Sequence, residues 1–488
     1  MRSAVEAMTE APPLFKHQEE AVDFVLSRGG SGCLFHDPGL GKTRTALHTF
    51  FRLKVRTPIL KLLVVCPLSL INAAWREDLK KFFGEAAAER FFDIHDEGLP
   101  DMLPSSVDFF AVNYEFFQRE ENVQKFIAAS RHLELMAVLD ESSKIKNHAS
   151  LTTKHLLAIR NLFKHRVVMS GTPAPNSEEE YWAQLEFARP NVLGKSFNKF
   201  KRTYFHLRGR GGVPINTGGM IMSKAVMADL FRKQGAEWAI LPEKREALFR
   251  EIGPWIHAAK KEECLDLPDQ IDETRLVQMG PKQKAAYRQM KNLLVAEIQG
   301  QDVVAQVALA KLMKLREITS GFAISENQEI VETECPKLAA LEEILDELGD
   351  RQAIIWCQFT WEIERIQKFL HSKEQSFADL YGGTRGKEES ISGFIDGKYR
   401  YLIANPHSAA HGLTFVNCSH QIFFSLDYSW EAYEQARART HRAGQKNICV
   451  YYHIMADGTI DQEILEVLRK KGDAQEIVFR LKSPEILK

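Results

Sequence analysis

His36-Asp37-Pro38-Gly39-Leu40-Gly41-Lys42-Thr43 decides the fold of this chain. It follows the short apolar segment 33–35 and precedes a helical stretch. This order of strand, glycine-rich turn, Lys-Thr and helix is typical of a phosphate-binding loop, because glycines let backbone N–H groups approach phosphates and the helix N-terminus favours negative charge. We expect Lys42 to neutralise the β- and γ-phosphates and Thr43 to hold Mg²⁺. The strict motif has Gly where His36 stands, so an ordinary turn before a helix is the alternative.

Short apolar runs alternate with helical stretches on the C-terminal side of this loop. They are residues 61–67, 107–112, 133–140 and 165–171 in the first third, and 351–359, 399–406, 419–427 and 446–455 in the last third. Such alternation predicts parallel sheets covered by helices on both faces. The middle, from about 176 to 330, reads as mostly helical, with an exposed Gly-rich loop at 207–219. The sequence therefore predicts an α/β protein with two parallel-sheet lobes at 1–205 and 336–488 and a helical insertion region at 206–335.

Composition excludes several classes of protein. The 488 residues carry 65 acidic and 64 basic side chains, which rules out a globally basic coat for nucleic acid but not a local basic groove. Seven cysteines form no CxxC pair, so neither a zinc knuckle nor a disulfide scaffold is indicated. We expect a reducing, cytoplasmic compartment. Because no run of about 18 apolar residues occurs, we expect no membrane span.

Paired carboxylates follow one of the predicted strands. Asp140-Glu141 ends the apolar run 133–140, where the first carboxylate could hold Mg²⁺ and the second could deprotonate the attacking water. Alternatively, Asp140 caps the following helix. Ser170-Gly171-Thr172-Pro173 ends the next run and either couples the γ-phosphate region to the neighbouring lobe or forms an ordinary turn. Gln18 has an amide that suits the edge of adenine, although a lone Gln is more often a surface residue.

Two arginines stand out in the last third. Arg439 and Arg442 lie within Gln435–Gln445 and are three residues apart, so a helix would place both guanidinium groups on one face. Such a pair could stabilise charge on a transferring phosphoryl group. The alternative is a solvated basic helix face.

A basic segment in the middle is a candidate contact for nucleic acid. Residues 195–212 contain no acid, and their basic residues are Lys195, Lys199, Lys201, Arg202, Arg208 and Arg210. Basic side chains displace counterions from phosphates, and nothing here resembles base readout, so we expect sequence-independent binding of DNA. The alternative is a solvated basic loop above a small cluster of the interleaved aromatic residues.

These motifs together resemble the Swi/Snf-type ATPases of helicase superfamily two. The resemblance covers about residues 12–465 and is carried by HQEEAVDFVL, DPGLGKT, VVCPLSLINAAWREDLKKF, VNYEFF, DESSKIKN, MSGTPAPN, AIIWCQFTWEIERIQKFL, LYGGTRGKEESISGF, ANPHSAAHGLTF and QARARTHRAGQ. It implies two RecA-like lobes that use ATP and Mg²⁺. It also implies nucleotide contacts from Pro38 to Thr43 and from Gln18, Thr172, Gly412 and Gln435.

The resemblance assigns roles to the candidate site residues and also exposes departures. It implies that Lys42, Asp140 and Glu141 serve hydrolysis and that Arg439 and Arg442 enter the site from the second lobe. The departures from the family pattern are His36-Asp37-Pro38, where the family has acidic-acidic-Met; Ser143, where it has His; His257, where it has Arg; Ala438, where it has Asp; and Trp430-Glu431-Ala432, where it has Trp-Asn-Pro.

The expected function is an ATP-driven motor that translocates on double-stranded DNA or remodels complexes bound to it. A strand-separating helicase and a nucleotide-gated DNA clamp without turnover are the alternatives. A small-molecule P-loop kinase would leave the second lobe unexplained. A protein partner or a DNA structure is expected to supply specificity. The compact motor with its divergent loop suggests a bacterial or phage setting.

Overall fold

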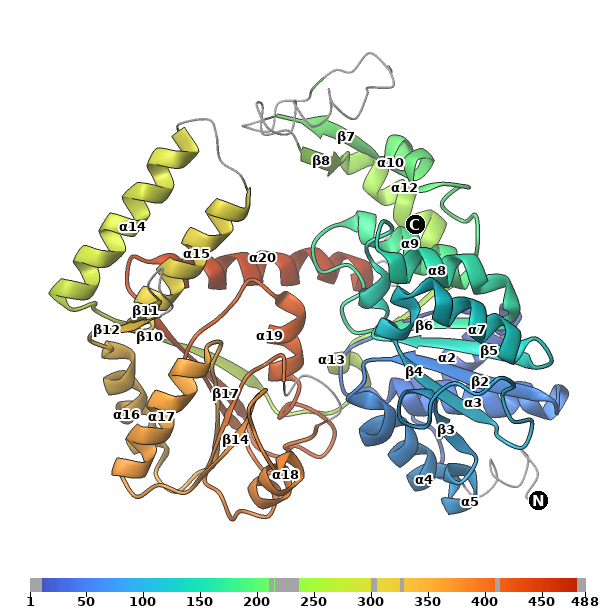
Figure 1. Cartoon of the computed structure of the whole chain (residues 1–488), viewed down its shortest axis with the longest axis horizontal. Coiled ribbons are helices and arrows are strands. Elements are labelled where there is room, and N and C mark those ends of the chain that lie inside the picture. The colour runs from blue at the N-terminus through green and yellow to red at the C-terminus, as the bar shows by residue number, and fades with distance from the viewer. Residues whose placement is uncertain are drawn as a thin grey trace. The chain divides into compact units, whose positions relative to one another are not determined.

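The computed structural model describes residues 11–209, 215, 237–299, 305–324, 329–408 and 413–480. Arg210 and Gly412 lie outside the described residues. The chain divides into two compact units, residues 1–265 with 474–488 and residues 266–473 (Figure 1). The predicted insertion region 206–335 is thus shared between the two units. Its exact boundaries stay a prediction.

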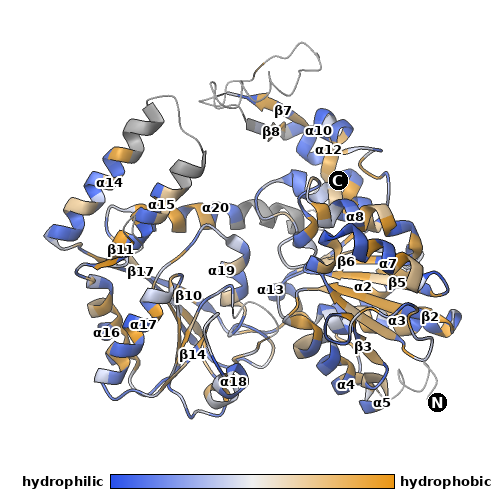
Figure 2. Ribbon diagram, viewed as in Figure 1, coloured by the Kyte–Doolittle hydropathy of each residue, from blue (hydrophilic) through white to orange (hydrophobic). Residues whose placement is uncertain are grey.

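The first unit is built on a seven-stranded parallel sheet. The strand order is β3 (Phe91–Asp93), β4 (Phe109–Asn113), β2 (Leu60–Cys66), β5 (Glu134–Asp140), β6 (Phe163–Ser170), β1 (Gly32–His36) and β9 (Ile256–Ala259). Every residue of β1, β2 and β4 is buried, because helices cover both faces and leave no solvated side. Figure 2 shows these strands as the apolar centre of the unit.

Two apolar clusters fill the space between this sheet and its helices. One joins the sheet to α2 (Lys16–Ser27), α3 (Lys42–Arg56) and α4 (Glu77–Phe83). The other joins it to α7 (Glu120–Ser130), α8 (Leu151–Ile159), α9 (Tyr181–Ala188) and α12 (Pro242–Ile252). The sheet therefore has a core on each face.

The second unit repeats this plan with a six-stranded parallel sheet. Its order is β10 (Gln270–Val277), β17 (Cys449–Ala456), β16 (His420–Phe423), β13 (Ala353–Trp356), β15 (Tyr401–Ala404) and β14 (Phe377–Leu380). One cluster packs it against α16 (Pro336–Leu348) and α17 (Thr360–Ser372), and another against α14 (Pro281–Gln299), α15 (Ala305–Thr319), α18 (Lys387–Ile395), α19 (Trp430–Arg437) and α20 (Ile460–Arg480). The two units confirm the predicted pair of RecA-like parallel-sheet lobes.

The middle of the chain is less helical than the sequence predicts. Helices α10 (Phe197–Tyr204), α12, α14 and α15 form, but β9 adds an edge strand to the first sheet and β10 adds one to the second. Both strands were missed for opposite reasons. The four residues of β9 are buried and too few to show a period, whereas β10 is largely exposed and polar.

The remaining elements are short. They are α5 (Glu85–Ala88), α6 (Ile94–Glu97), α13 (Lys261–Cys264), the hairpins β7 (Phe205–Arg208) with β8 (Glu237–Ile240) and β11 (Phe322–Ile324) with β12 (Ile330–Glu332), the π-helix η1 (Ile71–Arg76), and the 3₁₀ turns η2 (Tyr114–Gln118), η3 (Ser142–Ile145), η4 (Arg160–Leu162), η5 (Glu178–Glu180) and η7 (Gly253–Trp255). Among the described helices, none is both long and apolar enough to cross a membrane.

Candidate functional site

The predicted phosphate loop connects β1 to α3. Gly39 and Gly41 adopt positive φ angles of 95° and 74°, the left-handed region that glycine enters without strain. Lys42 begins α3, and its buried ammonium group donates to the carbonyl oxygen of His36 at 3.0 Å. Thr43 lies half-buried in the first turn of the helix. The loop therefore has the strand–turn–helix geometry that anion binding requires.

Gln18 is buried beside this loop and is not the surface residue of the alternative interpretation. Its Nε2 donates to the Leu40 carbonyl at 3.1 Å, and its Oε1 accepts from the Phe15 amide at 3.2 Å. His17 Nε2 lies 3.0 Å from the same Leu40 oxygen. The start of α2 thus supports the loop directly from behind Gly41.

The predicted carboxylates lie at the carboxyl end of β5. Asp140 is buried, and its Oδ2 accepts from the Trp75 indole N–H at 2.9 Å while its Oδ1 accepts from the Glu141 amide at 3.1 Å. Burial raises the pKa of Asp140, and the positive charge of Lys42 opposes that rise. Loop lysine and carboxylate therefore share one electrostatic environment, as the motif order predicts.

Glu141 has an unusual backbone conformation. Its φ of 52° and ψ of 55° place a non-glycine residue in the left-handed region, where steric strain of about 1–3 kcal/mol has to be offset by its surroundings. Such strain concentrates at functional sites. The N-cap position of η3 belongs to Glu141, and no side chain caps this turn, so Asp140 is not its cap. The role of Asp140 in holding Mg²⁺ stays a prediction.

Ser170-Gly171-Thr172-Pro173 lies against the phosphate loop. A Cβ on Gly171 would come within 2.9 Å of two ring carbons of Pro38, so the two turns touch. The Thr172 amide donates to the Ser170 hydroxyl at 3.0 Å. The Thr172 hydroxyl is buried and has no hydrogen-bond partner among the described residues. An unpartnered polar atom beside a phosphate loop fits the predicted nucleotide contact.

Two supporting residues were missed by the sequence interpretation. Trp75 reaches Asp140 from η1, and π-helical turns are rare and frequently mark functional sites. Gln184 on α9 bonds the Ser142 hydroxyl and the Pro173 carbonyl. The available signal was a single amide in the otherwise mostly apolar run Tyr181–Ala188, which is buried along its whole length.

The predicted arginine pair converges on one acceptor in the second unit. Nη1 of Arg439 and Nη1 of Arg442 each donate to the Leu413 carbonyl at 3.0 Å. The helical premise was wrong, because α19 ends at Arg437. The Gln421 amide donates to the Arg437 carbonyl at 3.1 Å and to the Thr440 hydroxyl at 2.7 Å, so a side chain from β16 shares the carbonyl at the end of the helix.

Two further residues of the same segment belong to α19. Gln435 is buried within α19, and its contact with nucleotide stays a prediction. Arg437 forms a two-pronged ion pair with Asp272 of β10, with N–O distances of 2.5 and 3.1 Å, and stacks over Tyr451 at 4.0 Å. Arg437 therefore joins the sheet edge to α19, whereas its neighbours Arg439 and Arg442 face the Leu413 loop.

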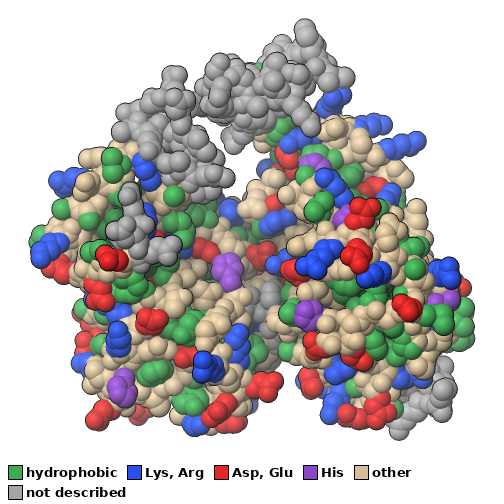
Figure 3. Space-filling model, viewed as in Figure 1, with side chains coloured by type: hydrophobic (Ala, Val, Ile, Leu, Met, Phe, Trp, Pro, Cys, Tyr) green, Lys and Arg blue, Asp and Glu red, His purple; other side chains and the backbone are tan. Residues whose placement is uncertain are grey.

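The basic segment forms an amphipathic helix, α10. Phe200 and Tyr204 are buried beneath it, so the aromatic residues pack inward as the alternative interpretation has it. Lys195, Lys199 and Arg202 are exposed, and Figure 3 shows basic side chains on the surface around this helix.

The other basic residues of the segment are less available. Lys201 Nζ lies 2.9 Å from a Glu179 oxygen and 4.7 Å from the centre of the Trp238 ring, and Arg208 is half-buried on β7. The DNA track stays a prediction, with Lys195, Lys199 and Arg202 as its exposed members.

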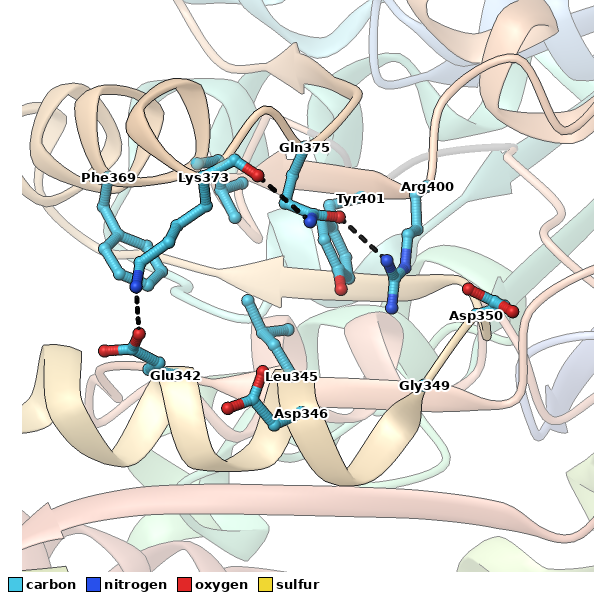
Figure 4. Close-up of a pocket in the computed structure, with 11 residues that line it drawn as sticks. Glu342, Leu345, Asp346, Gly349, Asp350, Phe369, Lys373, Gln375, Arg400 and Tyr401 are labelled. Atoms are coloured by element: carbon cyan, nitrogen blue, oxygen red, sulfur yellow. Dashed lines mark hydrogen bonds and ion pairs between the residues drawn. The ribbon is translucent and has the colours of Figure 1, made fainter.

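A separate hollow of about 350 Å³ lies in the second unit, between the C-terminal ends of α16 and α17 (Figure 4). Both of its basic side chains have partners in the lining, since Lys373 pairs with Glu342, and Arg400 donates to Gln375 at 2.8 Å. It lies at the amino ends of β13 and β15, whereas ligands of open parallel sheets bind at the carboxyl ends. We assign it no role.

Comparison with known proteins places these motifs in a family. The family described as SNF2-related domain matches residues 17–321, and that described as helicase conserved C-terminal domain matches residues 336–444. The human DNA repair and recombination protein RAD54B is 23% identical over 96% of this chain and 55% of its own length. The Saccharomyces cerevisiae nuclear protein STH1/NPS1 is 24% identical over 91% of this chain and 33% of its own.

Two further comparisons complete this set. A Caenorhabditis elegans homologue of SWI/SNF-related matrix-associated actin-dependent regulator of chromatin subfamily A-like protein 1 is 23% identical over 94% of this chain and 61% of its own. A solved Sulfolobus solfataricus SWI2/SNF2 ATPase core in complex with dsDNA is 22% identical over 99% of this chain and 96% of its own, with a TM-score of 0.44. The chain spans about a third to three fifths of the length of these curated relatives, which come from human, yeast and nematode. They give no support to the bacterial or phage setting.

Proposed function

Because the chain belongs to the SNF2-related domain family, we propose that it is a DNA-dependent ATPase of helicase superfamily two, which moves along double-stranded DNA or remodels complexes bound to it. One observation carries the proposal. The buried Asp140 carboxylate at the end of β5 shares its surroundings with the loop lysine, Lys42, and is followed by the strained Glu141 turn. That combination supports phosphoryl transfer as the chemistry of this site.

The residues of the first unit divide the work of hydrolysis. Lys42 and the amides of the glycine-rich loop would bind the phosphates, and Thr43 with Asp140 would hold Mg²⁺. When bound, Mg²⁺ would neutralise charge on the phosphate oxygens. Glu141 would orient the attacking water and take its proton at the carboxylate.

The second unit would supply positive charge to the same reaction. Arg439 and Arg442 converge on the Leu413 carbonyl, so one loop fixes both guanidinium groups. We propose that this pair stabilises the charge of the transferring phosphoryl group. On the DNA side, exposed Lys199 and Arg202 would contact backbone phosphates without reading bases.

The test is steady-state phosphate release without nucleic acid, with single-stranded DNA and with double-stranded DNA. We expect duplex to stimulate release, Lys42→Ala to abolish it, and Lys16→Ala, at an exposed lysine on α2, to leave it unchanged. Stimulation by single strands alone would favour a strand-separating helicase. Nucleotide-dependent DNA binding without any release would favour the clamp.

We also propose a protein partner that supplies specificity, and a reducing cytoplasmic compartment. All seven cysteines are free thiols, and Cys33, Cys66, Cys357, Cys418 and Cys449 are buried. Seven titratable thiols in protein isolated without reductant and then unfolded would agree with this compartment, whereas fewer thiols would contradict it.

A further inference from the structure

The side chain of Gln184 on α9 joins two turns at the carboxyl edge of the first sheet. The Ser142 hydroxyl donates to Gln184 Oε1 at 2.6 Å, and Gln184 Nε2 donates to the Pro173 carbonyl at 2.6 Å and to the Glu180 carbonyl at 3.0 Å. Ser142 directly follows Asp140-Glu141, and Pro173 ends the Ser170–Pro173 turn. One amide thus spans the carboxylate turn and the turn that touches the phosphate loop.

The chemistry of the partners fixes the orientation of this amide. The two carbonyl oxygens can only accept, so the NH₂ end of Gln184 has to face them. Its oxygen therefore faces Ser142, whose hydroxyl has to donate. Gln184 and Ser142 are both 0% exposed, so water cannot replace any of these bonds. The link has one arrangement and no solvated alternative.

Contacts extend from both ends of the link to the candidate catalytic groups. On one side, Ser142 is the first residue of η3 and follows Glu141, whose φ of 52° needs the surrounding structure to hold it. On the other side, Gly171 packs against Pro38 of the phosphate loop. A shift of Gln184 would therefore move the carboxylate turn relative to the phosphate loop.

We propose that Gln184 is a positioning residue that holds the Asp140-Glu141 turn in register with the Gly171-Thr172 turn, and through it with the phosphate loop. This inference rests on the proposed ATPase function. Gln184 contacts neither water nor nucleotide in this role and acts only through Ser142 and Pro173. Phosphoryl transfer is sensitive to such register, because a misplacement of about 1 Å can lower a rate about 100-fold.

The experiment compares Gln184→Met, Ser142→Ala and the double variant with Ser130→Ala as the matched control. Ser130 is also buried, but its hydroxyl donates to the Phe126 carbonyl within α7, away from both turns. We expect each single variant to lower kcat about 10- to 100-fold with KM for ATP changed less than about threefold. The double variant should be no worse than either single one, since both break one link. Ser142→Thr, which keeps the hydroxyl, should restore most of kcat.

Hydrogen–deuterium exchange of the full chain gives a readout that is independent of turnover. In Gln184→Met and Ser142→Ala, the amides of residues 140–146, 170–172 and 174 should exchange faster, while those of the strands should not change. In Ser130→Ala, the amides of both turns should exchange as in the wild type. If the wild type hydrolyses no ATP, the proposed function fails, yet the exchange pattern still decides whether Gln184 couples the turns. Unchanged kcat, or faster exchange throughout the first unit, would overturn the inference.

Discussion

Gly41→Ala tests how closely the start of α2 supports the phosphate loop. Gly41 has a φ of 74°, and a Cβ built on it would lie 2.4 Å from Gln18 Nε2. Ordinary contact begins at 3.4 Å, so the amide would have to retreat by about 1 Å. That movement would break its hydrogen bond to the Leu40 carbonyl, which is 3.1 Å long.

The cost has two separable parts. An L-residue in the left-handed region loses about 1–2 kcal/mol. A buried amide left without its acceptor loses about 1–3 kcal/mol. Leu40 keeps His17 as a partner at 3.0 Å, so its oxygen adds little to the loss. We therefore expect Gly41→Ala to lower the free energy of unfolding by about 2–5 kcal/mol.

Urea unfolding of the full chain measures this loss, and Gly29→Ala is the matched control. Gly29 has nearly the same φ of 72°, but no described atom lies within 4 Å of its would-be Cβ. It should lose only the backbone part, about 1–2 kcal/mol. In a Gln18→Ala background the additional cost of Gly41→Ala should fall to that same value. Equal losses for Gly29→Ala and Gly41→Ala in the wild-type background would refute the reasoning.

Three more predictions concern other polar side chains. Trp75→Phe removes the N–H donor that stabilises the ionised Asp140, so the pKa of Asp140 should rise further. The acid limb of the pH profile of kcat/KM should then move to higher pH. An acid limb at the same pH would contradict this. Burial lowers the pKa of His453 from its ordinary 6.5 to about 4. Between these pH values the unfolded chain binds a proton that the folded chain does not. The free energy of unfolding of the second unit should therefore fall by up to about 3 kcal/mol as the pH falls from 6.5 to 4. His453→Gln should flatten that dependence in pH-resolved thermal melts. Arg437→Lys cannot keep both prongs to Asp272 and should cost about 1.5–3 kcal/mol in urea unfolding, whereas an unchanged midpoint would show that the fork adds nothing.

The buried centre of each sheet could be predicted from the sequence, but its edges could not. β2 and β5 are apolar runs that end in turn or catalytic residues, and both appear within a residue or so of the predicted runs. β3, β9 and β14, which have three or four residues, all lie at the edge of a sheet. The helix content of the middle region was overestimated because β10 is a polar edge strand. Hydrogen bonds to β17 hold it in the sheet, and few of its own side chains are apolar and buried.

The candidate site divides along a similar line. Lys42, Asp140 and the Ser170–Pro173 turn were predictable because their chemistry depends on residue type and on order along the chain. Trp75 and Gln184 were not, because hydrogen bonds across 65 and 42 residues leave no local pattern. The end of α19 was missed because no Gly or Pro marks it. Side chains from two neighbouring strands, Gln421 and Tyr451, instead bond its last carbonyl, that of Arg437.

Two of the departures from the family pattern are in fact one contact. His36 Nε2 and His257 Nδ1 lie 2.9 Å apart, at positions separated by 221 residues and brought together by the pairing of β1 with β9. In that bond one ring has to donate and the other has to accept, so exchanging either imidazole alone removes a contact between two buried rings. The His36 carbonyl also accepts a hydrogen bond from the Lys42 ammonium group. The histidine pair therefore anchors the strand end that orients the loop lysine, and the unusual residue before the glycines does not count against a nucleotide site.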